Sequence, residues 1–201
     1  MSVKPAITTA HPESRIHPLV ADGIIVVAAS LFVALCAHIA IPLWFTPVPL
    51  TLQPFAVLLI GLTLGSRRGF AALVLYLAEG AVGLPVFNPL GPGGIAQLLG
   101  PTGGYLMAYP VAAFVAGYAA ERWHVAEHRF SSALDIVFGA LSAELVMFTG
   151  GALWFWTLTH YPAKTIFAMS VFPFLPGEAI KIAFACAIAL QWKRFRKNSV
   201  Q

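Results

Sequence analysis

The sequence contains little charge and few cysteines. Only 10% of its 201 residues are charged, compared with about 25% in soluble globular proteins, and 59% are hydrophobic. This composition excludes a soluble globular protein and indicates an integral membrane protein. The two cysteines, Cys36 and Cys186, lie in apolar stretches without the spacing of a metal site or a redox pair. We expect both to be small buried side chains.

Several motifs of enzymes and nucleotide-binding proteins are also absent from the sequence. It has no Gly-x-x-x-x-Gly-Lys-Ser/Thr loop, so we expect no ATP binding by this chain. It has neither a Gly-x-Ser-x-Gly elbow nor a His-Glu-x-x-His pair, which disfavours lipase and metalloprotease activity. His124 and His128 have a spacing that suits zinc, but they lie in a charged loop, where a solvated surface is expected. We therefore predict no catalytic residues, no metal and no cofactor.

Long hydrophobic runs are the main feature that the sequence does contain. About 20 apolar residues span the ~30 Å hydrocarbon core of a bilayer, and six runs approach this length. They predict an all-α membrane protein whose single six-helix domain covers residues 20–192, between an N-terminal tail (1–19) and a basic C-terminal tail (193–201). The first span lacks the short basic leader of a signal peptide, so we expect it to be retained. The predicted spans are residues 23–43, 48–64, 69–87, 104–120, 133–158 and 167–192.

The distribution of lysine and arginine predicts how these spans are oriented. Ten of the twelve basic residues lie in the two tails and in the connections after the second and fourth spans. The connections on the other side hold only Lys164. By the positive-inside rule, both termini are cytoplasmic. Because this scatter accounts for the net charge of +4 without a basic face, we expect no nucleic-acid binding.

An acid and a base lie together within the last span. Glu178 and Lys181 are three residues apart in a stretch, residues 171–190, that has no other charge. On a helix this spacing places both side chains on one face. A charged group in an apolar span costs ~2.5–3.5 kcal/mol on insertion scales, and retained groups usually line a ligand or ion path. The pair is therefore the first candidate for a binding site, with a structural salt bridge as the alternative.

Two connections on the side opposite the termini are rich in proline and glycine. Residues 45–54 contain three prolines and Gln53, whose amide either binds a substrate or satisfies freed backbone groups. Residues 83–105 contain dense glycine and proline, and irregular backbone at membrane depth persists only where it is buried or lines a cavity. Gly103 and Gly104 begin the next helix, whose free N–H groups favour an anionic or polar ligand group. A rigid loop with Tyr105 at the membrane interface is the alternative.

Two further acids, Glu79 and Glu144, lie within predicted spans. Glu79 follows Arg68 by eleven residues, roughly 16 Å along a helix, which places it in the outer half of its span and makes it a candidate site residue. Glu144 lies at about mid-depth, close to Gly150 and Gly151, which allow close packing of helices. We expect Glu144 to have a structural or protonated role.

Four stretches, in order and within residues 20–192, carry a more specific signal. They are Phe45-Thr-Pro-Val-Pro-Leu-Thr-Leu-Gln53, Gly83-Leu-Pro-Val-Phe87, Leu99-Gly-Pro-Thr-Gly-Gly-Tyr105 and Phe174-Leu-Pro-Gly-Glu-Ala-Ile-Lys181. Together they resemble the BioY family, the biotin-binding S component of energy-coupling factor (ECF) transporters. The resemblance implies an S-component fold in the cell membrane that captures biotin from outside. A transmembrane ECF coupling protein and a pair of cytoplasmic ATPases would then drive its import.

The resemblance also implies which residues contact the ligand, namely Gln53, Tyr105, Glu178 and Lys181. It further implies that the coupling protein docks on small residues of the first helix, which here are Ser30 and Ala34. With the loop and helix positions above, the predicted substrate-binding residues are Gln53, Tyr105, Glu178, Lys181, Glu79, Asn88, Gly103 and Gly104.

Three positions depart from the family pattern. Glu178 replaces the usual Asp and is one methylene longer, and the run Asn88-Pro89-Leu90 replaces the common Ala-Gly-Gly. Glu79 occupies a position that is usually apolar. These departures bear on specificity more than on fold, and they keep open an S component for another small vitamin or carboxylate.

Two functions of other classes also stay open. One is an intramembrane enzyme with an acid such as Glu79 or Glu144 as its acid or base, although no nucleophile lies beside a base. The other is an ion-coupled carrier that works alone, with Glu144 as a relay. If the ligand is biotin, Lys181 would bind its carboxylate or its ureido carbonyl, while Glu178 and Gln53 bind ureido N–H groups. Both orientations of the ligand are compatible with the sequence.

Overall fold

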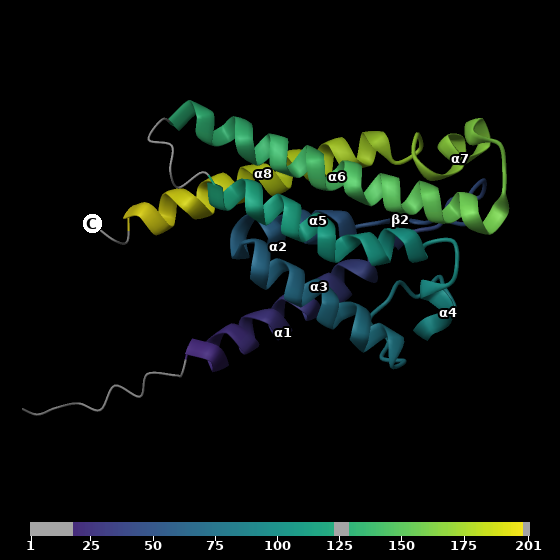
Figure 1. Cartoon of the computed structure of the whole chain (residues 1–201), viewed down its shortest axis with the longest axis horizontal. Helices are drawn as coiled ribbons and strands as arrows, with labels where there is room; N and C mark the ends of the chain where they lie inside the picture. Colours follow the sequence, from purple (N-terminus) through teal and green to yellow (C-terminus); the bar gives the residue numbers. More distant parts are fainter. Residues whose placement is uncertain (1–17, 123–128, 199–201) are drawn as a thin grey trace, which may run out of the picture.

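The computed structural model describes residues 18–122 and 129–198, and these residues are mostly helical (Figure 1). The predicted all-α class is thus confirmed, apart from one short antiparallel pair of strands. His124, His128 and most of the predicted N-terminal tail lie outside the described residues. The elements are α1 (Pro18–Ala37), β1 (Ala40–Ile41), β2 (Leu50–Thr51), α2 (Gln53–Leu64), α3 (Ser66–Ala81), α4 (Gly94–Leu98), α5 (Gly103–Arg122), α6 (Arg129–Thr159), α7 (Ala163–Ser170) and α8 (Leu175–Asn198).

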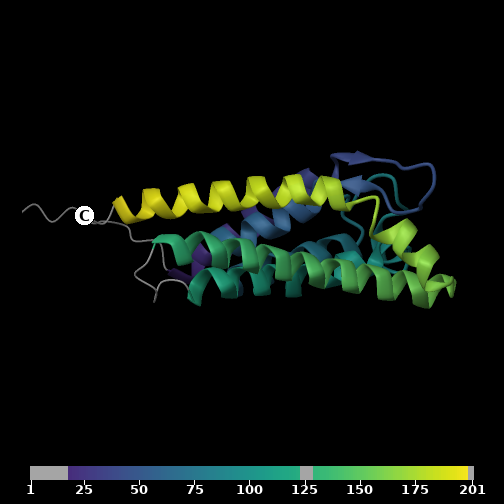
Figure 2. The same ribbon diagram turned by 90° about the horizontal axis from the view of Figure 1, so that it is seen from above.

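The long helices run lengthwise, and the short elements gather at one end of the bundle (Figures 1 and 2). Helix α5 packs against α2, α3 and α6, while α8 packs against α2 and α6 and α1 packs against α3. The strand pair, α4 and α7 lie at what we call the loop end. The start of α1 and the end of α8 lie at the other end, the terminal end.

Three helices of the described part are long and apolar enough to cross a bilayer by themselves. These segments are Leu19–Ala37, Ala133–Thr159 and Leu175–Phe195, and the shorter apolar helix Gln53–Leu64 accompanies them. Helix α3, with 16 residues, extends roughly 24 Å, and the 12 residues of α2 extend roughly 18 Å. The hydrophobic runs therefore mark helices, but those of α2 and α3 are shorter than the predicted spans.

Proline and glycine explain where the predicted spans were too long. The sixth span is not continuous, because α7 ends at Ser170 and α8 begins at Leu175. Pro173 lies in this break, and the residue before a proline is disfavoured in helical conformation. The third span ends at Ala81, just before Gly83, which has a φ of 94°. Helix α1 ends at Ala37, so the segment up to residue 43 belongs to a connection.

Glycines allow α5 and α6 to pack closely, as the sequence predicted for Gly150 and Gly151. A Cβ atom on Gly104 of α5 would lie 2.3 Å from the backbone oxygen of Gly150. A Cβ atom on Gly151 would lie 2.1 Å from the ring of Tyr105. Small residues at a crossing let helix backbones approach in this way. The position of the Tyr105 ring thus depends on the absence of a side chain at Gly151.

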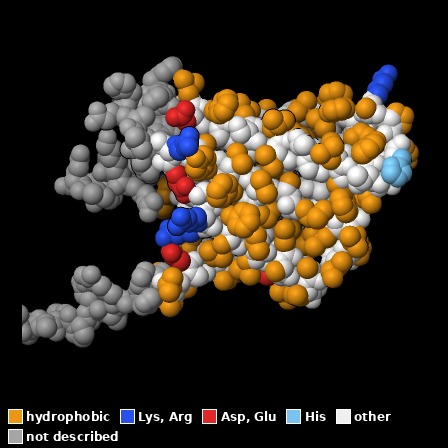
Figure 3. Space-filling model, in the orientation of Figure 1, with side chains coloured by type: hydrophobic (Ala, Val, Ile, Leu, Met, Phe, Trp, Pro, Cys, Tyr) orange, Lys and Arg blue, Asp and Glu red, His pale blue; other side chains and the backbone are white. Residues whose placement is uncertain are grey.

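The surface separates apolar and charged side chains along the length of the molecule. In the face shown in Figure 3, hydrophobic side chains cover the middle, acidic and basic side chains gather at the terminal end, and a basic side chain and a histidine lie at the loop end. Arg68 and Asp22 form an ion pair of 2.6 Å, and Glu121 accepts hydrogen bonds from the backbone nitrogen and hydroxyl of Ser66, both at 2.7 Å. An apolar belt bounded by charged ends is the surface of a membrane protein.

The structure overturns one prediction about this surface. Ser30 and Ala34 of α1, which were expected to present a docking face, are both buried. They lie on the side of α1 that packs against α3, where the Ser30 hydroxyl donates a hydrogen bond to Oε1 of Glu79 at 3.1 Å. Small residues let two helices approach whether the partner is another protein or the same chain, and here the partner is α3.

Candidate functional site

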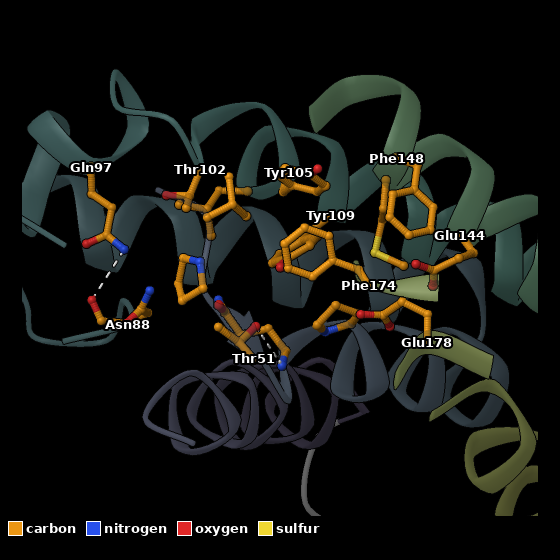
Figure 4. A pocket seen from close by; sticks show the side chains of 16 residues that line it. Thr51, Asn88, Gln97, Thr102, Tyr105, Tyr109, Glu144, Phe148, Phe174 and Glu178 are labelled. Atoms are coloured by element: carbon orange, nitrogen blue, oxygen red, sulfur yellow. Dashed lines mark hydrogen bonds between the residues drawn. The ribbon is translucent and has the colours of Figure 1, made fainter. Parts of the chain in front are cut away.

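A cavity lies between the loop-end connections and the helices beneath them (Figure 4). We call it the inner cavity, and its volume is about 40 Å³. Residues from β2, from the connections before α2, α5 and α8, and from helices α2, α4, α5, α6 and α8 contribute to it. They are Val48, Pro49, Thr51, Gln53, Pro54, Asn88, Gln97, Thr102, Tyr105, Leu106, Tyr109, Glu144, Met147, Phe148, Phe174 and Glu178.

A second, larger cavity lies beside the inner cavity, among the connections themselves. This mouth cavity has a volume of about 240 Å³ and is lined by residues from 42–49 and 88–102. Pro49, Asn88, Gln97 and Thr102 line both cavities. The four shared residues therefore form the boundary between the two cavities.

Aromatic side chains form much of the wall of the inner cavity. Tyr105 and Tyr109 are four residues apart on α5 and so share one face of that helix. The Tyr105 hydroxyl donates a hydrogen bond to the backbone oxygen of Ser170, at the end of α7. Phe148 of α6 and Phe174, which precedes α8, add two further rings to this wall (Figure 4). Apolar walls with a few polar groups are typical of small-molecule sites.

The predicted pair of Glu178 and Lys181 is formed, and it is buried. The ammonium of Lys181 donates a hydrogen bond of 2.7 Å to Oε1 of Glu178 and one of 2.5 Å to the backbone oxygen of Thr51. Only 4% of Glu178 and 9% of Lys181 is exposed. Glu178 lines the inner cavity, whereas Lys181 does not line it but connects two residues that do. The acid is therefore the member of the pair that faces the cavity.

Gln53 lies at the inner cavity, and its side chain bonds to another side chain rather than to the freed backbone groups that the sequence offered as one alternative. Its amide nitrogen donates a hydrogen bond of 2.7 Å to the Tyr76 hydroxyl, which in turn donates to the backbone oxygen of Val86 at 3.1 Å. This chain of hydrogen bonds joins the start of α2 to α3 and to the connection after α3. Gln53 also lines the inner cavity. The residue thus supports the wall of the cavity and contributes to its surface.

Asn88 and Gln97 hold the second connection in place at the boundary of the two cavities. The Gln97 amide nitrogen donates to the backbone oxygen of Asn88 at 3.3 Å, and its amide oxygen accepts from the nitrogen of Gly93 at 3.1 Å. The side-chain oxygen of Asn88 accepts from the nitrogen of Leu90 at 2.8 Å. Gln97 was not predicted, because its role depends on the fold of a glycine-rich segment without periodicity.

Besides Lys181, three predicted site residues do not line either cavity. Glu79 is directed toward Ser30 of α1, as described above. A Cβ atom on Gly103 would lie 1.8 Å from the backbone oxygen of Leu98, and one on Gly104 would lie 2.2 Å from Cβ of Trp154. Both glycines serve close packing at the start of α5. Among residues 18–122 and 129–198, no cluster of three or more His, Cys, Asp or Glu side chains could hold a metal ion.

Glu144, for which we expected a structural or protonated role, lines the inner cavity. Its side chain comes from α6 and is 7% exposed, and Oε2 has no hydrogen-bond partner in the described part of the chain. The sequence showed only that an acid lies inside an apolar span. It did not show how α6 is rotated, and this rotation turns the acid toward the cavity rather than toward lipid.

Comparisons with known proteins agree with the family resemblance that the sequence motifs indicated. The BioY family model matches residues 8–198. The probable biotin transporter BioY of Pyrococcus horikoshii is 40% identical over 161 residues, which cover 80% of this chain and 90% of that protein. The biotin transporter BioY of Rhodobacter capsulatus is 36% identical over 181 residues, which cover 86% and 92%.

A solved structure is also similar to this chain over most of its length. It is the crystal structure of the S-component for biotin from an ECF-type ABC transporter, and the similarity has a TM-score of 0.74 at 26% sequence identity. The match covers 88% of this chain and 92% of that one. Together with the matched residues and the cavity described above, these findings show that the chain belongs to the BioY family.

Proposed function

We propose that this protein takes up biotin as the substrate-capturing S component of an ECF transporter in the cell membrane. Its relatives are transport proteins and not enzymes, and the ligand would bind in the inner cavity. The observation that carries the proposal is Glu178, which lines the aromatic cavity: its Oε1 is paired with Lys181, and its buried Oε2 has no hydrogen-bond partner among the described residues. A buried acceptor of this kind suits a ligand that brings N–H donors.

The proposal includes six membrane crossings and cytoplasmic termini. Helices α1, α2, α3, α5, α6 and α8 would cross the bilayer, while the short helices α4 and α7 would lie at its outer surface. Two observations support this arrangement: the described ends of the chain lie together, and charged side chains gather beside them (Figures 1 and 3). The positive-inside rule then places the terminal end in the cytoplasm and the loop end outside.

The chemistry of biotin fits the side chains of the inner cavity. Biotin has a cyclic urea with two N–H donors at one end and a carboxylate at the other, with an apolar ring and chain between them. The aromatic wall of Tyr105, Tyr109 and Phe174 suits the apolar part, and Glu178, Gln53 and Asn88 supply polar contacts. Lys181 would act through Glu178, whose carboxylate it holds in place.

The size of the cavity implies that binding involves a movement. Small-molecule sites usually enclose about 300–1,000 Å³, well above the 40 Å³ of the inner cavity. The mouth cavity, beyond Asn88 and Gln97, supplies further volume. We therefore propose that biotin enters through the mouth cavity and that the connections 42–49 and 88–102 shift to admit it.

Transport would require partners that this chain does not supply. An ECF coupling protein in the membrane and a pair of cytoplasmic ATPases would convert binding into import. Because no P-loop is present in the sequence, the energy would come from those partners. Uptake by cells that express this chain without an ATPase pair, together with loss of uptake when an uncoupler is added, would support the ion-coupled carrier instead.

Equilibrium binding to the isolated chain tests the proposed ligand. We expect radiolabelled biotin to bind the purified protein in detergent and to be displaced by unlabelled biotin, because the inner cavity combines an apolar wall with buried acceptors. A panel of other small vitamins and carboxylates should not displace it. Displacement by one of these at lower concentration than biotin would favour an S component for that compound.

The extra methylene of Glu178 permits a second test. We expect Glu178→Asp to withdraw both carboxylate oxygens by about one methylene, which weakens the ion pair with Lys181 and moves the acid away from the ligand, because aspartate reaches less far along the same direction. Biotin affinity should fall by about tenfold, or ~1.4 kcal/mol, as measured by the same binding assay. Unchanged affinity would mean that the cavity adapts to either acid, and that the departure at this position does not tune binding.

A further inference from the structure

The inner cavity contains two buried carboxyl oxygens without a hydrogen-bond partner in the described part of the chain. They are Oε2 of Glu144 on α6 and Oε2 of Glu178 on α8. A third such atom, on Glu79, does not line the cavity. An unpaired buried polar group costs about 1–3 kcal/mol, so native structures seldom retain two in one place without a use. A ligand that brings two donors would remove both costs.

The two acids occupy the same end of the inner cavity. In Figure 4 the carboxyl groups of Glu144 and Glu178 lie close together, and Asn88, Gln97 and Thr102 lie at the opposite end. The side chains at that opposite end are amides and a hydroxyl, which carry no charge. The polar groups of the cavity are therefore divided into an acidic end and a neutral end.

The two carboxyl groups at the acidic end are only partly paired. Glu178 has Lys181 as its ion-pair partner, at 2.7 Å. Glu144 forms no ion pair with a described residue, and it is more than nine-tenths buried. The unpaired carboxyl oxygens at this end can accept hydrogen bonds from N–H donors, whereas a ligand carboxylate would offer them no donor.

We infer that Glu144 determines ligand specificity and orientation in this site: with Glu178 it binds the cyclic urea of biotin, each acid accepting one N–H group. The ligand carboxylate then lies at the neutral end, toward the mouth cavity. This inference rests on the proposed function. It extends that function by assigning a role to Glu144 and by choosing between the two orientations that the sequence left open.

Substitutions at Glu144 test this assignment by equilibrium binding. Glu144→Gln keeps the shape and one acceptor oxygen but replaces the other oxygen with an amide that donates, so biotin affinity should fall by about tenfold. Glu144→Leu removes the acceptor, and affinity should fall by about 100-fold. The matched control is Asp135→Asn, which changes an exposed acid of the same helix to its amide and should leave binding unchanged. Size-exclusion profiles and melting temperatures report folding, and Glu144→Asp replaces the leucine variant if that variant does not fold.

Ligand analogues separate direct recognition from a structural role. Biotin methylated at one ureido nitrogen has already lost one N–H donor. For one of the two N-methyl isomers, Glu144→Leu should therefore cause no further loss of affinity, while the other isomer stays sensitive. If Glu144 only supports the fold, biotin and both isomers lose affinity by the same factor, which overturns the inference.

The amide of biotin, which has a neutral tail, tests the orientation. With the carboxylate far from Glu144, the ratio of the affinities of biotin and biotinamide should be the same in the parent and in Glu144→Gln. A rise in that ratio would place the carboxylate beside Glu144 and reverse the orientation. If the parent protein does not bind biotin, the proposed function is overturned. If the parent and the Glu144→Leu variant bind biotin equally well, only this inference is overturned.

Discussion

Lys181→Ala is expected to weaken biotin binding by ~3 kcal/mol or more, which is over about 100-fold. The substitution leaves the carboxylate of Glu178 buried without its cation and removes the donor to the backbone oxygen of Thr51. Both changes occur at residues that line the inner cavity. Radiolabelled biotin and the purified variant in detergent give the measurement.

Two further variants show whether this loss comes from the ion pair. Lys164→Ala removes an exposed lysine of α7, away from the cavity, and should leave affinity unchanged. The double variant Lys181→Met with Glu178→Gln removes both charges, so it should recover most of the thermal stability that Lys181→Ala loses, but not biotin binding. If Lys181→Ala binds biotin as tightly as the parent, the ion pair has no part in the site.

A second large effect is expected from Gly104→Val, which should lower the free energy of unfolding by about 3 kcal/mol or more. Cβ at this position would lie 2.2 Å from Cβ of Trp154 and 2.3 Å from the backbone oxygen of Gly150. Because the second contact involves backbone, α5 and α6 would have to separate. This movement would also displace the Tyr105 ring from Gly151, so biotin affinity should fall together with the melting temperature.

The control for this prediction is another helical glycine. A Cβ atom on Gly23 of α1 has no atom within 4 Å, so Gly23→Ala should leave the melting temperature unchanged or raise it slightly. Equal melting temperatures for Gly104→Val and the parent would contradict the close packing of α5 on α6. The comparison separates a loss of helix packing from the general effect of replacing glycine in a helix.

The family was accessible from local sequence, and four of the eight predicted substrate-binding residues line the inner cavity. Gln53, Asn88, Tyr105 and Glu178 line the inner cavity as expected, because each belongs to or adjoins a short motif whose proline, glycine or charge has a direct local consequence. Tyr109 was not predicted, although its spacing of four residues from Tyr105 would have placed it on the same face. The breaks in the helices were missed because hydropathy averages over a window in which single residues such as Pro173 carry little weight.

Composition and spacing by themselves determined that this is a helical membrane protein with an acid and a base on one face of its last helix. These features depend on each residue and its near neighbours along the chain. Only the tertiary structure decided that Glu144 faces the cavity, that Lys181 is set behind Glu178, and that Ser30 is turned toward Glu79. The physical reason is that the rotation and crossing of each helix follow from its packing against the others, and the partners in that packing are distant in sequence.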